Sequence, residues 1–248
     1  MTLALVHGNP ETAAVWDDLI PQLKRDDIVA LSPPGFGASI PAGFGCTSDD
    51  YLAWLADAVA SLPGPVDVLG HDWGGGHVLR LAMERHDDIR SWASDIAGCF
   101  DPDYVWHERA QIWQTPGDGE KAVAEMSAAP TEARAKRFES IGMSANVAAK
   151  VAAAQSEEMG RAILAVYRSA RQPMMAAAGK RLGRAAAKPG LVIIPTEDGY
   201  TGGETLARRS AERAGAEIAV LQGLGHWWMC EDPARAAEPL NRFWAGLN

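Results

Sequence analysis

The residues best suited to covalent chemistry lie in one short stretch, Gly-His-Asp-Trp-Gly at positions 70–74. A valine-rich apolar run precedes this stretch, and a segment with helical spacing, residues 75–85, follows it. A strand, a sharp turn and a helix in this order form a nucleophile elbow, G-x-nucleophile-x-G, here with an aspartate at its centre. The glycines let strand and helix approach closely, and the helix start offers N–H donors to a carboxylate. We therefore expect Asp72 to be a nucleophile, the alternative being an ordinary turn rich in glycine and aspartate.

A carboxylate that attacks a saturated carbon forms an ester, and the ester needs an activated water to turn over. His226 lies in a glycine-rich loop just after the last expected strand, so it can reach the elbow as a general base. Asp198 follows the preceding expected strand and is the expected acid that orients this histidine. The chain order of nucleophile, acid and histidine is typical of enzymes with such an elbow. Glu197 and Asp95 are alternative acids.

Attack on the ester builds negative charge on an oxygen, and this charge requires preorganised N–H donors. The stretch His-Gly-Asn-Pro-Glu, residues 7–11, follows the first expected strand and reaches the same region as the elbow. The backbone N–H groups of Asn9 and Trp73 are the natural pair of donors, and we expect them to hold the oxyanion.

Strand and helix patterns alternate along most of the chain. We expect strands at residues 3–6, 27–31, 66–70, 91–97, 191–195 and 218–221, and helices at residues 12–23, 47–62, 75–85, 205–213 and 232–247. The alternation predicts an α/β fold with a mostly parallel, doubly wound sheet. An alanine-rich helical block interrupts it. We therefore predict a core domain of residues 1–100 and 189–248, with a helical cap, residues 101–188, inserted between its two parts.

The two glycine-rich motifs, at residues 7–10 and 70–75, resemble the aspartate-nucleophile branch of the α/β-hydrolase superfamily, which holds epoxide hydrolases and haloalkane dehalogenases. The resemblance covers nearly the whole chain, cap included. It implies an α/β-hydrolase fold with Asp72 as nucleophile, His226 as base and Asp198 as acid. In this family His7 shapes the oxyanion loop and is not catalytic.

One departure from the family concerns the sheet. The family usually has two strands before the His-Gly loop, which here begins at residue 7, so we expect about six strands. The first two of these would lie near an exposed edge of the sheet. Because exposed edges are often covered by a partner, a homodimer is a hypothesis for this chain.

The expected cap contains the residues that would select the substrate. Residues 160–169 resemble the cap helix of epoxide hydrolases that ends in Tyr-Arg, which implies that Tyr167 protonates the opening ring oxygen. Trp106 and His107 resemble epoxide hydrolases in which a histidine replaces the other cap tyrosine, with Tyr104 as the fallback. Tyr167 also has a purely structural interpretation in the core of the cap, as does His107 on a solvent-facing helix.

A haloalkane dehalogenase instead needs N–H donors for a halide, and the Trp73 indole with the Asn9 side chain matches that need. Since Trp73 is shared by both subfamilies, only Asn9 favours the dehalogenase. We expect an enzyme that opens epoxides to vicinal diols. The alternatives are a haloalkane dehalogenase, another reaction on this scaffold, or a non-catalytic protein that binds small molecules.

The composition of the chain indicates which kinds of partner it can bind. The net charge of −9 argues against nucleic acid and anionic membranes, and no apolar run approaches the roughly 18 residues that span a bilayer. No leader pattern is visible, and the three cysteines are widely spaced, as expected of free thiols in a reducing compartment. We expect a cytoplasmic enzyme that needs no metal or organic cofactor and acts on a small apolar organic substrate.

Overall fold

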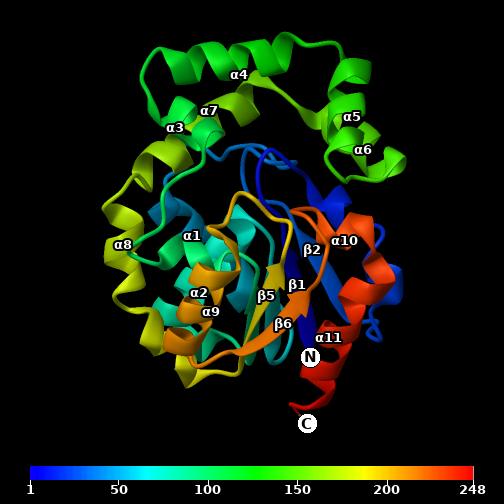
Figure 1. The fold of residues 1–248 in the computed structure, drawn as a ribbon, viewed down its shortest axis with the longest axis vertical. Coiled ribbons are helices and arrows are strands. Elements are labelled where there is room, and N and C mark those ends of the chain that lie inside the picture. Colours follow the sequence, from blue (N-terminus) through cyan, green and yellow to red (C-terminus); the bar gives the residue numbers. More distant parts are fainter. Residues whose placement is uncertain (248) are drawn as a thin grey trace.

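A six-stranded sheet forms the centre of the computed structural model, which describes residues 1–247 (Figure 1). The strand order is β2-β1-β3-β4-β5-β6, and every neighbouring pair is parallel. The strands are β1 (Thr2–Val6), β2 (Ile28–Leu31), β3 (Val66–Gly70), β4 (Ser91–Ser94), β5 (Gly190–Pro195) and β6 (Glu217–Leu221). The predicted α/β fold with about six parallel strands is confirmed.

Helices follow most of the strands, and a block of helices separates β4 from β5. The first and last parts of the chain contain α1 (Ser48–Ala60), α2 (Trp73–Glu84), α9 (Gly203–Ala214), α10 (Trp228–Glu231) and α11 (Pro233–Ala245). The block contains α3 (Glu108–Gln114), α4 (Asp118–Ala128), α5 (Thr131–Ser140), α6 (Ala145–Ala154), α7 (Glu157–Ser169) and α8 (Met174–Gly179). Short 3₁₀ helices are η1 (Ala13–Trp16), η2 (Ile20–Gln22), η3 (His86–Asp88), η4 (Ala97–Phe100) and η5 (Leu182–Ala187).

The sheet is buried on both faces because its strands alternate their side chains between two apolar clusters. In β1, Ala4 and Val6 join the cluster that contains α1 and α2, whereas Leu3 and Leu5 join the cluster that contains α11. Strands β1, β3, β4 and β5 are buried throughout. This two-sided burial explains why their sequences are nearly continuous apolar runs.

The register of the central strands brings the carboxyl ends of three strands together. Val6 pairs with Gly70, and Gly70 pairs with Ser94. The residues that follow these three strands therefore emerge side by side at the carboxyl edge of the sheet, where ligands of such sheets bind.

Two predicted elements differ in the structure. The helix expected at residues 12–23 is instead two short 3₁₀ helices, η1 and η2, with Pro21 at the start of the second. A proline inside an α-helix removes a backbone hydrogen bond and clashes with the preceding turn. The strand expected at residues 91–97 ends at Ser94, and η4 begins at Ala97.

Helices α3 to α7 lie above the carboxyl edge of the sheet (Figure 1). Helices α3, α4 and α7 contact one another, and α5 contacts α6, so the block contains two groups of helices. The last part of the expected cap lies beside the core, because α8 contacts η4, and η5 contacts α2 and α9. Below, "the cap" means α3 to α7, and the division of the chain into two domains stays a prediction.

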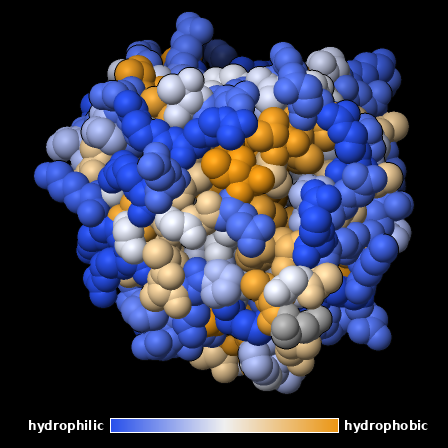
Figure 2. Space-filling view, turned by 60° about the horizontal axis from the view of Figure 1, so that its bottom comes forward, coloured by the Kyte–Doolittle hydropathy of each residue, from blue (hydrophilic) through white to orange (hydrophobic). Residues whose placement is uncertain are grey.

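The edge strands carry exposed apolar side chains. Val29 in β2 is 37% exposed, and Ile218 and Val220 in β6 are 38% and 39% exposed. Figure 2 shows one face of the molecule on which apolar side chains gather in a limited area among hydrophilic ones. Dimerisation through the β2 edge stays a prediction.

Within residues 1–247, no helix combines the length and apolarity needed to cross a membrane.

The turn from β3 to α2 packs directly against the end of β1. A Cβ atom on Gly74 would lie 2.1 Å from the carbonyl oxygen of Val6, and one on Gly70 would lie 2.4 Å from the carbonyl oxygen of Gly74. Neither backbone can move away from the added Cβ atom without displacing a central strand. Glycine is therefore required at both positions for the elbow to form.

Replacing Gly74 with alanine should lower the free energy of unfolding by about 3 kcal/mol or more, because the new methyl group overlaps the β1 backbone. Gly183→Ala is the matched control, since its Cβ would meet nothing closer than 3.6 Å, and it should change stability by less than about 1 kcal/mol. Urea unfolding of both variants measures the difference. Equal stabilities would show that the elbow is not so tightly packed.

Candidate active site

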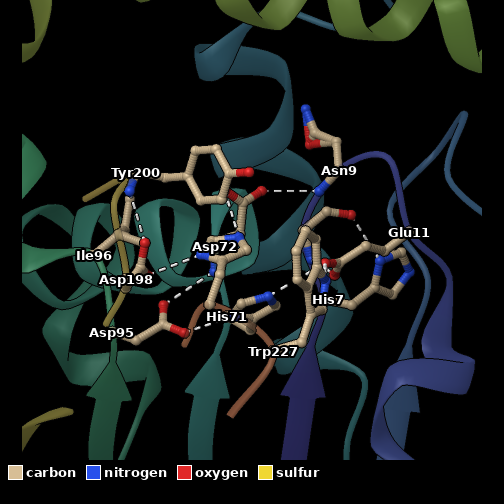
Figure 3. A network of polar contacts seen from close by, with 12 residues as sticks. His7, Asn9, Glu11, His71, Asp72, Asp95, Ile96, Asp198, Tyr200 and Trp227 are labelled. Carbon is tan, nitrogen blue, oxygen red and sulfur yellow. Dashed lines mark hydrogen bonds and ion pairs between the residues drawn. The ribbon is translucent and has the colours of Figure 1, made fainter. Parts of the chain in front are cut away.

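Asp72 occupies the turn between β3 and α2 in a backbone conformation that is unusual for a residue with a side chain. Its φ is 49° and its ψ is −127°, which strains a non-glycine residue by roughly 1–3 kcal/mol. The Asp72 backbone N–H donates to Asp95 Oδ1 at 3.0 Å, and the Asn9 backbone N–H donates to Asp72 Oδ1 at 2.9 Å (Figure 3). These two contacts hold the strained turn and fix the direction of the carboxylate.

His226 and Asp198 lie beside the Asp72 carboxylate. His226 Nδ1 lies 2.8 Å from Asp198 Oδ2, and its Nε2 lies 3.7 Å from Asp72 Oδ2. The backbone N–H of Tyr200 donates to Asp198 Oδ1 at 2.7 Å and holds this carboxylate in place (Figure 3). The histidine therefore contacts Asp198, and not Asp95, through Nδ1. Its Nε2 is left free toward Asp72.

Charges and burial at this site set the protonation states. Burial raises the pKa of Asp72 to about 6, with a further contribution from the Glu11 charge, although His226 opposes the rise. Burial disfavours a charged His226, but the Asp198 carboxylate outweighs burial and raises the pKa of the imidazole. Burial likewise disfavours ionised Asp198, and His226 outweighs it and lowers the pKa of Asp198. The three side chains thus form one electrostatically coupled group.

A second buried network lies beneath the first. His71 Nδ1 lies 2.5 Å from Asp95 Oδ2, and its Nε2 lies 3.2 Å from Glu11 Oε1. Burial opposes a charge on His71, but Asp95 and Glu11 outweigh it and raise the pKa of the ring well above its ordinary value. The indole of Trp227 also donates to Glu11 Oε1 at 2.5 Å, and the indole of Trp228 donates to Asp95 Oδ2 at 2.8 Å. A cationic His71 therefore lies between two carboxylates.

Glu11, His71 and His226 also offer ligand atoms within 4.8 Å of one another, a spacing that a metal ion could bridge. A metal ligand must present an unprotonated nitrogen. Both ring nitrogens of His71 instead point at carboxylates and are protonated at its raised pKa. The cluster is therefore an ion-pair network.

A cavity of about 620 Å³ leads from Asp72 to the cap. A volume of this size accommodates a small organic molecule. The reacting end is lined by Asp72, His226, Tyr167, His107 and Tyr200. A small adjoining pocket is lined by Asp72, Tyr167, His107 and Tyr200 again, together with Trp73 and Tyr104. The structure thus brings the expected cap residues to the elbow.

The cap residues form a packed aromatic cluster above Asp72. The Tyr167 ring meets the Trp73 ring edge-on at 5.0 Å and the Trp106 ring at 5.4 Å. The Tyr104 hydroxyl donates to the Tyr200 carbonyl at 2.8 Å, so it is already used in holding the loop after β5. Tyr104 therefore supports the pocket wall, and its hydroxyl is less available to a substrate than that of Tyr167.

Tyr200 is a residue of the site that the sequence motifs did not indicate. Its ring lies 4.9 Å from that of His226 and 5.0 Å from that of His107, and it lines both parts of the cavity. Figure 3 shows the ring above Asp72. Its position two residues after Asp198 was the only available signal, because the loop that carries the acid must also lie next to the histidine.

Comparison with known families identifies the fold. The sequence model of the alpha/beta hydrolase family matches residues 3–238. This chain belongs to the alpha/beta hydrolase family. Among solved structures, a loop variant of the haloalkane dehalogenase DbeA from Bradyrhizobium elkanii superimposes with a TM-score of 0.74 at 19% identity, covering 99% of this chain and 89% of that one. Epoxide Hydrolase A from Mycobacterium thermoresistibile superimposes with a TM-score of 0.74 at 20% identity, covering 100% and 92%.

Curated relatives of this alpha/beta hydrolase match over shorter segments. Haloalkane dehalogenase 2 of Mycobacterium tuberculosis is 35% identical over 94 residues, which are 36% of this chain and 32% of that protein. The probable oxidoreductase EphD of Mycobacterium tuberculosis is 40% identical over 78 residues, which are 29% of this chain and 13% of that protein. The matches span no more than about a third of either relative.

Replacing Glu11 with glutamine should lower the free energy of unfolding by about 3 kcal/mol, because it leaves the buried His71 cation with one carboxylate fewer. Burial disfavours ionised Glu11, but its neighbour His71 outweighs burial and lowers the pKa of this carboxyl from 4.5 to about 2. The ionised form is therefore favoured by folding, and this stabilisation is complete above pH 4.5 and disappears as the pH falls toward 2.

The control for this prediction is Asp49→Asn, which removes an ion pair between Arg80 and an aspartate that is 87% exposed. Such surface pairs contribute about 0.2–1 kcal/mol. Urea unfolding at neutral pH and at pH values below 4.5 compares the two variants with the unmodified chain. If Glu11→Gln costs no more than Asp49→Asn at neutral pH, the buried network does not stabilise the fold.

Proposed function

We propose that this chain hydrolyses epoxides to vicinal diols through an ester intermediate on Asp72. One observation carries the proposal: Asp72, Tyr167 and His107 line the same small pocket at the end of the main cavity. A carboxylate and two groups able to donate a proton can therefore reach the carbon and the oxygen of one bound epoxide ring. Opening a strained ether requires this combination of a nucleophile and a proton donor.

Tyr167 is fully protonated at neutral pH. Burial, together with the nearby Asp72 charge, raises the pKa of its hydroxyl well above the ordinary value. A neutral phenol donates a hydrogen bond to the ring oxygen, and it becomes a proton donor once that oxygen develops negative charge.

His107 is neutral and has a defined tautomer. Its Nδ1 accepts a hydrogen bond from the backbone N–H of Ala110 at 3.2 Å, as the N-cap of α3, so its proton lies on Nε2. Burial, followed by the charges of His226 and Arg109, lowers the pKa of His107 to about 4. The Nε2–H group is thus a second neutral donor on the cavity wall.

Ring opening begins at Asp72 Oδ2. The Asn9 N–H occupies Oδ1, which leaves Oδ2 as the attacking atom. The new bond joins Oδ2 to a ring carbon, the bond between that carbon and the ring oxygen breaks, and the oxygen takes a proton from Tyr167 or His107. The products of this step are an ester on Asp72 and a deprotonated cap donor.

Hydrolysis of the ester returns the enzyme to its starting state. His226 Nε2 takes a proton from water, and the resulting hydroxide attacks the carbonyl carbon of the Asp72 ester. Oδ1, now the carbonyl oxygen, becomes the oxyanion and stays against the Asn9 N–H, with the Trp73 N–H as the second proposed donor. Collapse releases the diol and the carboxylate, and the proton on His226 restores the cap donor.

A haloalkane dehalogenase is the second candidate, and one observation favours it. The Asn9 Nδ2 atom is buried and has no hydrogen-bond partner among residues 1–247, and Asn9 lines the main cavity. Figure 3 shows its side chain pointing away from Asp72, toward the cap. A buried N–H donor of this kind suits a halide leaving group. The later steps at Asp72 and His226 would be the same.

Replacing His226 with glutamine should trap the ester, because the base that activates water is lost. After incubation with 1,2-epoxyhexane, the intact mass of this variant should rise by the mass of one whole epoxide. After incubation with 1-bromohexane, a haloalkane dehalogenase would instead gain one hexyl group and release bromide.

The double variant Asp72→Asn, His226→Gln is the control, and it should gain no mass from either reagent. An adduct that persists in this control would place the nucleophile elsewhere. The absence of an adduct from both reagents in the His226 variant would exclude both candidate reactions.

Replacing Tyr167 with phenylalanine should lower kcat/KM for 1,2-epoxyhexane by about 100-fold, the usual contribution of a general acid. Tyr51→Phe is the matched control, because Tyr51 is equally buried but donates to the Pro34 carbonyl outside the cavity. Steady-state kinetics with both variants test the role of the phenol. Unchanged epoxide turnover in the Tyr167 variant would remove Tyr167 from the mechanism.

A further inference from the structure

Three arginines from two cap helices line the cavity that leads to Asp72. Arg109 lies on α3, and Arg134 and Arg137 lie on α5. The cavity therefore runs from the carboxylate in the core to a cationic region between these helices. Neither the reaction of Asp72 nor the packing of the cap requires positive charge there.

Arg109 and Arg137 are exposed, and their guanidinium groups make no ion pair or hydrogen bond within residues 1–247. The Arg109 guanidinium lies 5.8 Å from the centre of the Trp113 ring. Arg134 donates to the Ser127 carbonyl and the Thr131 hydroxyl, while its Nε is buried without a partner. By contrast, Arg168, a cap arginine that does not line the cavity, is paired with Glu120. The cavity thus holds donors that are not used within the fold.

The charges of Arg109 and Arg137 oppose each other across the cavity. Partial removal from water, followed by the charge of Arg137, lowers the pKa of Arg109, and Glu108 has a smaller opposite effect. Glu108 and Glu125 also line the cavity, and Glu125 faces Lys121 at 4.0 Å. The two acidic residues compensate the arginines only in part, because the repulsion from Arg137 outweighs the effect of Glu108 on Arg109. A bound anion would relieve this repulsion.

Apolar side chains line the same cavity as the arginines, and they include Ile112, Trp113, Met126 and Phe138. A ligand that fills the whole cavity would therefore need a reactive carbon at one end, an apolar middle part and an anionic group at the other end.

We propose that the arginines between α3 and α5 bind an oxyanion group of the substrate, a carboxylate or a phosphate, at the far end of an apolar chain whose other end reacts with Asp72. Guanidinium groups bind both anions through paired N–H donors. The anion site itself stands on the cap residues alone. The reactive end of the substrate rests on the function proposed above.

Binding of octanoate tests the anion site without any turnover. Octanoate should bind the unmodified chain at least about tenfold more tightly than octanamide, its neutral analogue, and the Arg109→Gln, Arg137→Gln double variant should lose this preference. Calorimetry with octanoate, octanamide and octyl phosphate gives the preference directly and shows which oxyanion binds better. Arg161→Gln is the matched control, because Arg161 is an exposed cap arginine outside the cavity, and it should keep the preference.

Turnover of an epoxide that carries a carboxylate then tests the reactive end of the proposed substrate. The ratio of kcat/KM for 7,8-epoxyoctanoate to that for its methyl ester should be at least about tenfold lower in the double variant than in the unmodified chain, and Arg161→Gln should keep the ratio. The loss of kcat/KM for 7,8-epoxyoctanoate should come from a higher KM and not from a lower kcat, since the arginines do not contact the reacting atoms. The preference should also shrink with added salt, which screens exposed charges.

The outcomes separate the two proposals. If octanoate and octanamide bind equally to the unmodified chain, or if the double variant keeps the preference, the anion site is wrong. If the preference depends on both arginines but no epoxide or haloalkane forms an adduct, the anion site stands and the proposed reaction fails. If the double variant weakens octanamide as much as octanoate, the arginines act on the shape of the cavity, and the anion site is again wrong.

Discussion

The site depends on a buried histidine cation held between two carboxylates. His71 immediately precedes the elbow aspartate and contacts Glu11 from the first loop and Asp95 from the end of β4. Asp95 in turn accepts the backbone N–H of Asp72, so the ion network reaches the strained turn directly. Charges buried this deeply are stable only as a complete set, since each carboxylate compensates the cation and the cation compensates both. The loops after β1, β3 and β4 are therefore tied to one another beneath the reacting groups.

This network separates structural charge from reactive charge. The lower layer joins Glu11, His71 and Asp95, and the pairing between Glu11 and His71 keeps both groups charged against the opposing effect of burial. The upper layer, with Asp72, His226 and Asp198, faces the cavity, and the pKa of Asp72 lies at about 6. In the proposed mechanism, proton transfer and nucleophilic attack take place in the upper layer. The lower layer keeps the geometry constant while the upper layer changes charge.

The core and the cap supply different parts of the chemistry. The aligned ends of the central strands place Asp72, the proposed nucleophile, and the loops after β5 and β6 place Asp198 and His226, so this part follows from the parallel sheet. The cap brings Tyr167 and His107 to the same pocket and adds the arginines of α3 and α5. Under the proposed function, substrate choice depends on helices that are separate from the sheet, and those helices can vary without disturbing the elbow.

The sequence by itself determined the features that depend on local pattern. The apolar runs determined the parallel sheet, and the spacing of glycines determined the elbow, because a strand, a tight turn and a helix each leave a short-range signature. Chain order also indicated His226 and Asp198, which the fold brings into contact. Only the tertiary structure decided that Glu11 lies under the site, and that Tyr200 and Arg109 face the cavity. These outcomes depend on where distant loops and cap helices pack, and no local pattern in the chain records such distances.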